Sequence, residues 1–203
     1  EGVSQSAIWA MESIGIDPAT GEEIYRNPNG TLTKYWNSAN QVVVGDEEPK
    51  VRGSFGFNVT WKNFSLYTTF MYECGGQRYN QTLADKVEGI DIVNDNADLR
   101  VLTDRWKNPG DISGFKKLQM ERDTGYETTR ATSRFVQDYN WLSLNSITLE
   151  YDFDAKYLKP LHLSMLRLGI GANELGRWST VKLERGLSYP YSRTINFSLK
   201  ASF

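Results

Sequence analysis

The last thirteen positions, 191–203, alternate between apolar and polar side chains with the two-residue period of a β-strand. The odd positions are apolar except for Arg193, and the even positions are Ser, Thr, Asn or Lys, so one face of the strand is apolar and the other polar. Such a strand either packs on a second sheet in a soluble sandwich or separates lipid from a water-filled lumen in an outer-membrane barrel. A sequence that stops on Phe203 at the end of this strand favours the barrel.

A β-hairpin is the clearest element in the middle of the chain. Its first strand places Phe55, Phe57, Val59 and Trp61 on one face, and its second places Phe64, Leu66, Phe70 and Tyr72 on one face. The two residues between them, Lys62 and Asn63, predict a tight antiparallel turn in which Asn63 takes the left-handed backbone conformation. Each run is about as long as the ~9–11 residues that cross a bilayer when tilted.

Three further strands are predicted besides the hairpin and the terminal strand. They cover 6–16, 141–153 and 163–173. The apolar positions change phase within the second of these, which predicts a β-bulge near Asn145 and Ser146. These strands bring the count to six, whereas a closed barrel needs at least eight. Either two strands escape the pattern or this is the end of a larger barrel.

The lengths of the links alternate. Two links are short, at 62–63 and 155–162, and three are long, at 17–52, 78–134 and 176–190. If the chain crosses a membrane at each strand, every short link lies on one side and every long link on the other. Outer-membrane barrels have short periplasmic turns and long extracellular loops, so we expect the long links outside the cell.

Composition narrows the class without settling it. The chain has 203 residues and a formal net charge of −2 with both signs interspersed, so it lacks the basic footprint of a nucleic-acid-binding protein. Its mean hydropathy is −0.51, and no apolar run approaches the ~18 residues of a spanning helix. Aromatic residues make up 13% of the chain, which suits the aromatic girdles of a barrel or an aromatic-rich sandwich.

Processing and redox chemistry give two further expectations. Cys74 is the only cysteine, so an internal disulfide and a thiolate metal cluster are excluded, and a small buried hydrophobe is the expected role. Residues 1–5 lack the charged and apolar regions of a secretory signal. We therefore expect that a leader was removed or that the chain is part of something longer.

A series of motifs runs through nearly the whole chain. In order they are Gly15-Ile16-Asp17-Pro18-Ala19-Thr20-Gly21, residues 49–57, Trp61-Lys62-Asn63-Phe64-Ser65-Leu66, Gly75-Gly76-Gln77-Arg78-Tyr79-Asn80, Arg105-Trp106-Lys107-Asn108-Pro109-Gly110-Asp111, residues 141–151 and the terminal Phe203. Together they resemble the C-terminal part of SusC/RagA-type TonB-linked outer-membrane transporters of Bacteroidetes. One departure is Asn173-Glu174-Leu175, where the family usually has Asn-Leu-Phe.

The resemblance implies a fold and a set of partners. It implies that 1–203 supplies the last ~6 strands of an antiparallel barrel of roughly 22 strands, whose plug domain and earlier strands lie elsewhere. The implied partners are the rest of the barrel and plug, TonB through the plug, a SusD-like surface lipoprotein, outer-membrane lipid and a glycan or peptide cargo. In such proteins the terminal aromatic strand is an assembly signal, here Ile195, Phe197, Leu199 and Phe203.

Catalytic and metal chemistry are poorly supported by the residues. His162 is the only histidine, so neither a Ser-His-Asp triad nor a zinc site can be assembled with it from the motifs present. Asn94, Asn96 and Asp98 have the spacing of a calcium loop but lack its glycine and its bidentate glutamate, so calcium in an extracellular loop is a weak possibility. We expect no catalytic residues and no resident cofactor.

Aromatic residues in the long links are the candidates for contact with cargo, because sugars and peptides both bind aromatic platforms with polar neighbours. They are Tyr35, Trp36, Tyr79, Trp106, Tyr126 and Trp178. The competing interpretation is that they are girdle or loop-core residues. The resemblance implies TonB-dependent import of oligosaccharides or oligopeptides across the outer membrane of a Gram-negative bacterium, and a soluble, secreted glycan-binding sandwich is the alternative.

Overall fold

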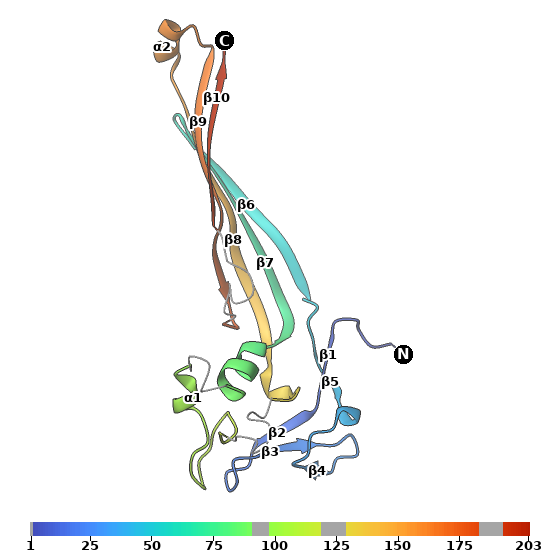
Figure 1. The fold of residues 1–203 in the computed structure, drawn as a ribbon. Coiled ribbons are helices and arrows are strands. Elements are labelled where there is room, and N and C mark those ends of the chain that lie inside the picture. Colours follow the sequence, from blue (N-terminus) through green and yellow to red (C-terminus); the bar gives the residue numbers. More distant parts are fainter. Residues whose placement is uncertain (1, 91–97, 119–128, 183–192) are drawn as a thin grey trace. The chain divides into compact units, whose positions relative to one another are not determined.

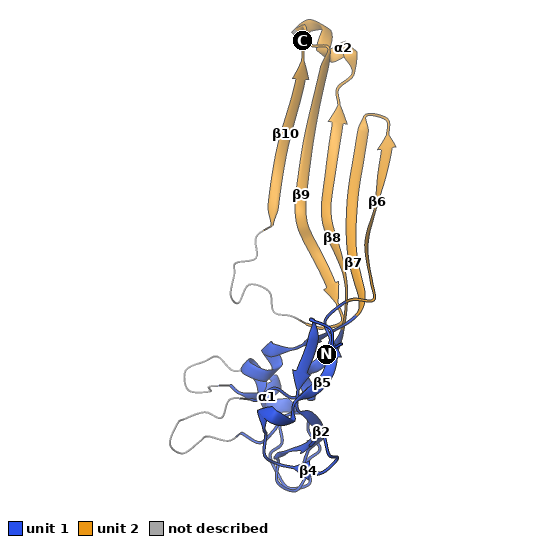
Figure 2. Cartoon of the chain, turned by 90° about the vertical axis from the view of Figure 1, so that its right-hand side faces the viewer, with its two compact units in different colours: residues 1–48, 76–138 blue, residues 49–75, 139–203 orange. Residues whose placement is uncertain are grey.

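The computed structural model describes residues 2–90, 98–118, 129–182 and 193–203. The chain divides into two compact units, one of residues 1–48 and 76–138 and the other of 49–75 and 139–203 (Figure 2). Two of the three divisions fall within strands β7 and β8, and the third, between residues 48 and 49, precedes β6. Among the described residues no helix has both the length and the apolar character needed to span a membrane.

The second unit is built on a five-stranded sheet in the order β10-β9-β8-β7-β6, so strands adjacent in sequence are adjacent in space (Figure 1). Its strands are β6 Val51–Trp61, β7 Phe64–Tyr79, β8 Val136–Asp152, β9 Met165–Ser179 and β10 Thr194–Ser202. The β6–β7, β8–β9 and β9–β10 pairs are antiparallel. The predicted hairpin, the strands near 141–153 and 163–173 and the terminal strand are therefore confirmed.

The two short links adopt compact turns. Lys62, not Asn63 as predicted, takes the left-handed conformation, with φ +52°. The Asn63 side chain is engaged instead, because its Nδ2 donates to the Asp152 carbonyl at 2.7 Å and to Asp154 Oδ1 at 2.8 Å. The second link forms the short helices α2 (Ala155–Leu158) and η4 (Lys159–Leu161).

A bulge interrupts the β8–β9 pairing between Leu144 and Ser146, at the predicted place. Leu144 pairs with Gly176 and Ser146 with Asn173, so three steps along β9 match two along β8. The extra residue is thus on β9, where Glu174 has φ +54°, and not on β8 as the phase change suggested.

The predicted strand 6–16 is wrong as a member of this sheet. It breaks at Met11 into β1 (Ala7–Ala10), which pairs with β5 (Val42–Asp46), and β2 (Glu12–Ile16), which pairs with β3 (Glu23–Arg26). β3 also pairs with β4 (Leu32–Thr33). The physical reason is that the successive residues Ala10 and Met11 are both fully buried, which a regular two-faced strand does not allow. The sheet therefore contains five of the six expected strands.

Cys74 also departs from its prediction. Its side chain is exposed, and it pairs with Val51 between β6 and β7. The pairing partner Val51 is exposed as well, at 54%. The expectation of a buried thiol rested on the usual burial of single cysteines, whereas position 74 lies near the end of the β6–β7 pairing.

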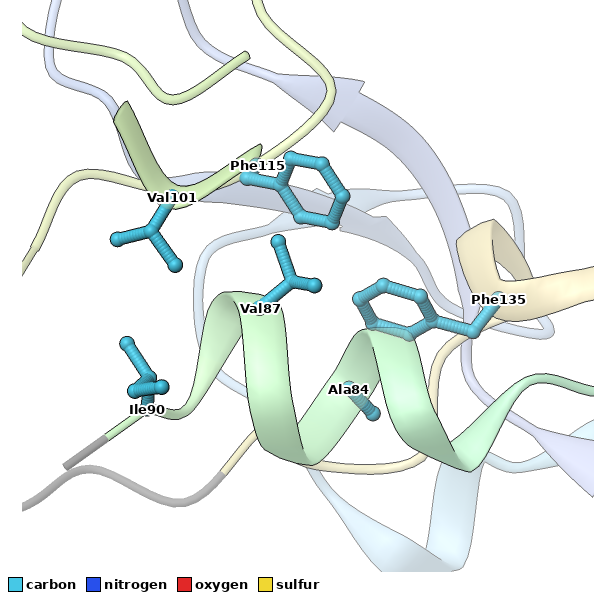
Figure 3. Packing of buried hydrophobic residues seen from close by; sticks show 6 residues of the cluster. All are labelled: Ala84, Val87, Ile90, Val101, Phe115 and Phe135. Atoms are coloured by element: carbon cyan, nitrogen blue, oxygen red, sulfur yellow. The ribbon is translucent and has the colours of Figure 1, made fainter. Parts of the chain in front are cut away.

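The first unit has the larger buried apolar core (Figure 3). It consists of Ala84, Val87, Ile90, Val101, Phe115 and Phe135, with Tyr79 and Leu83 packed against it. A π-helix, η2 (Leu83–Glu88), supplies Ala84 and Val87 to this core. The other helices of this unit are η1 (Ser38–Asn40), α1 (Arg100–Thr103) and η3 (Ser133–Phe135). The long link 78–134 is thus not an unstructured loop but holds a packed core.

Candidate functional site

One face of the five-stranded sheet is apolar and open. On β6 and β10 the alternating apolar side chains are between 47% exposed at Phe55 and 81% exposed at Phe197. The strand register continues this row, since Phe197 pairs with Ile170 and Ile170 pairs with Leu149. Exposure of such an apolar face to water is unfavourable, so we expect lipid or another apolar surface to cover it. The predicted assembly residues Ile195, Phe197, Leu199 and Phe203 are all exposed, three of them on β10.

The opposite face of the same strands is polar and carries a network of charges. Arg167 binds Asp152 through two parallel contacts, Nε to Oδ1 at 2.5 Å and Nη2 to Oδ2 at 2.8 Å, and binds Glu150 through Nη1 at 3.0 Å. Gly169 pairs with Glu150 on β8 and with Ser198 on β10, and a Cβ atom there would clash with the Ser198 hydroxyl. The glycine therefore leaves room on this face for a polar side chain of the neighbouring strand.

In the other unit, two of the motifs that carry the family resemblance bind each other. The Pro18 carbonyl accepts hydrogen bonds from the Trp106 indole Nε1 and from the Gly110 backbone N–H, both at 2.8 Å. Gly21 has φ +70°, and a Cβ atom there would come within 2.5 Å of the Trp106 ring. The Asp-Pro-Ala-Thr-Gly turn and the Arg-Trp-Lys-Asn-Pro-Gly-Asp segment are thus one structural clamp, which explains the glycine at position 21.

A buried ion cluster lies at the centre of the same unit. Arg134 joins two carboxylates that are almost completely buried: its Nε lies 2.7 Å from Glu23 Oε1, and its Nη2 lies 2.8 Å from the Glu88 carboxylate. Thr132 Oγ1 and the Tyr25 hydroxyl also donate to Glu23, at 2.5 and 2.8 Å. Since each carboxylate has several donors, the cluster satisfies the condition under which buried charges are tolerated.

The electrostatics of the cluster follow from burial and pairing together. Burial disfavours the charged carboxylate of Glu23, but the hydrogen bonds and charge of Arg134 outweigh it and lower the pKa of Glu23. Burial opposes the charge of Arg134 as well, and its two carboxylate partners nevertheless raise its pKa. The pKa of Tyr25 is raised, chiefly by burial and by the neighbouring Glu23 charge. All three groups stay in the protonation state they have in water, so the cluster is structural and lacks a group poised to exchange protons near neutral pH.

The aromatic residues predicted to contact cargo are dispersed. Trp36 donates its Nε1 hydrogen to the Ala131 carbonyl at 2.9 Å, and Trp106 belongs to the clamp. Tyr79 packs edge-on against Phe135 with 5.9 Å between ring centroids, and burial raises the pKa of its hydroxyl to about 12. These three side chains therefore hold the loops together, whatever else they contact. Contact with cargo stays a prediction for all of the aromatic candidates.

The remaining candidates show more exposure or cannot be placed. Tyr35 is 84% exposed and Trp178, on β9, is 58% exposed, so both offer open ring surface. Tyr126 lies outside the described residues. Among the described residues, exposed or half-buried rings that lie beside a cation include Trp36 beside Arg130, Trp61 beside Lys62 and Trp141 beside Arg177.

The candidates for metal or catalytic chemistry find no supporting arrangement. Asn94 and Asn96 lie outside the described residues, and Asp98 binds the guanidinium of Arg100 at 2.6 Å. Within the described part of the chain no group of three or more His, Cys, Asp or Glu side chains is placed to hold a metal ion. His162 has φ +55° after η4 and is exposed.

Sequence reasoning missed the buried ion cluster. Glu23 and Arg134 are 111 positions apart, and Glu88 lies 46 positions before Arg134. A charged residue in a polar link has no local periodicity that would reveal its partner. The one available signal was Glu23 itself. It is a charged residue at an inward-facing position of a short strand, where an apolar residue is expected.

Comparison with known proteins finds similarity to TonB-dependent receptors. No protein-family model matches the sequence. The chain is 23% identical over 165 residues to the TonB-dependent receptor P3 of Formosa agariphila, covering 80% of this chain and 15% of that protein. It is 26% identical over 167 residues to the TonB-dependent receptor P39 of the same organism, covering 76% of this chain and 15% of that protein.

Structures of the RagAB peptide transporter are among the solved structures with the same fold. The RagAB peptide importer in its open-open state superposes with a TM-score of 0.72 at 19% identity, covering 97% of this chain and 22% of that chain. A second RagAB peptide transporter structure gives 0.69 at 18% identity, covering 86% and 19%. The resemblance to SusC/RagA-type transporters and the antiparallel β fold are thus confirmed. The chain spans about 15% of the length of its curated relatives.

Proposed function

We propose that this chain supplies barrel strands and extracellular loops to a TonB-dependent importer in the outer membrane of a Gram-negative bacterium. The observation that carries the proposal is the sheet whose neighbouring strands share one open apolar face and one charged face. Lipid is the medium that stabilises such an apolar face without a second protein layer, and a hydrated lumen suits the opposite face. The similarity to TonB-dependent receptors supports the same function.

The orientation follows from the links. The turns at 62–63 and 155–162 would face the periplasm, and the unit of residues 1–48 and 76–138 would form a structured extracellular cap. The clamp and the ion cluster support this role, because they give the long links the internal packing that a rigid recognition surface needs. A recognition surface on ordered loops loses less conformational entropy on binding than one on mobile loops.

Cargo and partners are proposed by similarity. Because the fold matches chains of the RagAB peptide importer, we propose oligopeptides as the cargo and a SusD-like surface lipoprotein as the partner at the extracellular side. Coupling to TonB and the proton-motive force would run through a plug domain, which is not part of residues 1–203. Oligosaccharide remains the second candidate for cargo, since exposed aromatic rings such as those of Tyr35 and Trp178 suit sugars as well.

The alternative function, a soluble glycan-binding sandwich, requires a second sheet over the apolar face. Among the described residues, the smaller sheets are β1-β5 and β2-β3-β4, and both belong to the other unit. The side chains from Phe55 to Trp61 on β6 stay about half exposed or more, which does not fit a sandwich core.

Transport in the native organism tests the proposal. Deleting the gene should abolish uptake of labelled oligopeptides, and dissipating the proton-motive force should abolish it in the parent strain. Membrane fractionation should recover the protein with the outer membrane. Recovery of a soluble, secreted protein that binds glycan and leaves peptide uptake unchanged would establish the sandwich alternative instead.

A further inference from the structure

A polar pocket of about 570 Å³ lies in the extracellular unit, beside α1 and the clamp segment. Its lining includes Asp104, Arg105, Lys107, Asn108, Asp111 and Ile112. Its size is within the range of sites that bind small molecules or the ends of larger ones. Phe115 lines the pocket on one side and belongs to the buried core on the other, so the pocket has a fixed wall (Figure 3).

Arg105 gives this pocket an unusual cation. The residue is 7% exposed, and its guanidinium binds only backbone carbonyls, those of Val87, Glu88 and Lys116. Its Nε hydrogen is buried and has no hydrogen-bond partner among the described residues, and none of the described carboxylates forms an ion pair with it. Because the guanidinium is buried, a ligand in the pocket would experience the charge of Arg105 without bonding its Nε hydrogen.

Lys107 extends the positive character to the surface. It is exposed, lines the same pocket, and forms no ion pair with any described residue. The nearby Asp111 is already engaged, because its Oδ2 accepts the backbone N–H groups of Lys107 and Asn108 at 3.0 and 2.8 Å. The available charges are thus an exposed ammonium, a buried guanidinium and the carboxylate of Asp104.

The lining distinguishes between classes of cargo. The two carboxylates, Asp104 and Asp111, would repel a polyanionic polysaccharide. A neutral sugar would lack the exposed aromatic platform it normally uses, since Phe115 is 91% buried and is the one aromatic residue in the lining. A peptide end fits both signs: its carboxylate matches Lys107 and Arg105, and its backbone N–H groups match the Asp104 carboxylate. The side chain of Ile112, which is 95% exposed, is available for an apolar cargo residue.

We infer that this pocket is a subsite for the C-terminal carboxylate of an oligopeptide cargo, with Lys107 as its principal contact. The inference rests on the proposed function and deepens it, because it predicts which end of the cargo is recognised. A carboxylate on a lysine ammonium forms a charge-assisted hydrogen bond, which is roughly twice as strong as a neutral one. Removing the carboxylate charge should therefore weaken binding by about tenfold.

The test compares tetrapeptides that have a free C-terminal carboxylate with the same peptides as C-terminal amides. Binding is measured by calorimetry on the full-length transporter in detergent. The wild type should bind the free acids about tenfold more tightly than the amides, and Lys107→Gln should bring this ratio close to one. Lys156→Gln, which changes an exposed lysine of α2 in the other unit, should leave the ratio unchanged.

Each outcome separates the two proposals. Equal affinity for acids and amides in the wild type, with peptides still bound, overturns the subsite and leaves peptide import standing. A ratio that survives Lys107→Gln also overturns it. Binding of uronic-acid oligosaccharides that depends on Lys107, without binding of peptides, overturns the peptide assignment in both proposals.

Discussion

Replacing Arg134 should loosen the unit of residues 1–48 and 76–138 without affecting the five-stranded sheet. Arg134→Met leaves Glu23 and Glu88, whose side chains are each 1% exposed, without the cation they share. Breaking a buried ion pair by removing one partner costs about 3–5 kcal/mol. At 1.4 kcal/mol per factor of ten, the equilibrium constant for opening of this unit should increase by roughly 10²–10³-fold.

Hydrogen–deuterium exchange of the full-length protein in detergent measures this opening. Amides of η2 and of the segment around Phe115 should exchange faster in Arg134→Met, while amides of β9 and β10 should be unchanged. Arg26→Met is the matched control, because Arg26 pairs with Glu12 in an exposed ion pair whose side chains are 47% and 42% exposed. Such a pair contributes about 0–1 kcal/mol. Equal exchange in the two variants would refute the role assigned to Arg134.

The pH dependence gives a second arm of the same experiment. In the wild type Arg134 lowers the pKa of Glu23 below its ordinary value of 4.5, so this stabilisation is present above that value and is lost as the pH falls through the lowered one. Without Arg134, only neutral donors such as Thr132 oppose the effect of burial on Glu23, so its pKa should rise, because the charged form loses hydration. Lowering the pH from about 7 to about 5 should therefore reduce the difference in unfolding free energy of this unit between Arg134→Met and the wild type. A gap that widens would contradict the assignment.

The remaining predictions concern the clamp and the sheet. Gly21→Ala should destabilise the extracellular unit by about 2 kcal/mol or more in thermal unfolding, because its Cβ would meet the Trp106 ring at 2.5 Å, whereas Gly30→Ala, with open space around it, should cost less. Equal losses would argue against the clamp. Val59→Lys, on the apolar face of β6, should lower the unfolding free energy of the barrel in lipid vesicles by about 2–4 kcal/mol, and Asn58→Lys, on the opposite face, by much less. Equal effects of these two changes would argue against lipid contact.

The sheet was predictable because its alternation is strict. The hairpin around Lys62 and the terminal strand each present one uniform face, and two-residue periodicity specifies both the strand and its register. The prediction of one continuous strand at 6–16 was wrong because the alternation there is loose. Tertiary contacts of Met11 with Ala131 and Thr132 divide the segment into β1 and β2. Burial on both sides at successive positions is a property of the folded unit, not of the local pattern.

The bulge and the candidate sites show where local reasoning ends. A change of phase in the apolar positions of one strand indicates a bulge in its pairing with a neighbour. It does not show which of the two strands supplies the extra residue, which here lies on β9 near Glu174. Aromatic residues in long links were recognised as important, yet their exposure depends on partners distant in sequence, such as Ala131 for Trp36. Of the charged partners, only Glu23 had a local signal, its inward position in a short strand, and nothing local pointed to Glu88 or Arg134.

The central claim is that the apolar face of the sheet contacts lipid and the opposite face contacts water. Spin labels placed one at a time at positions 55–60 of β6, in the full-length protein with Cys74 replaced by serine and reconstituted in vesicles, test it most directly. Odd positions should be accessible to lipid-soluble oxygen and even positions to a water-soluble nickel complex, with a two-residue period. Accessibility without this alternation, or odd positions that both reagents fail to reach because protein covers them, would contradict the account.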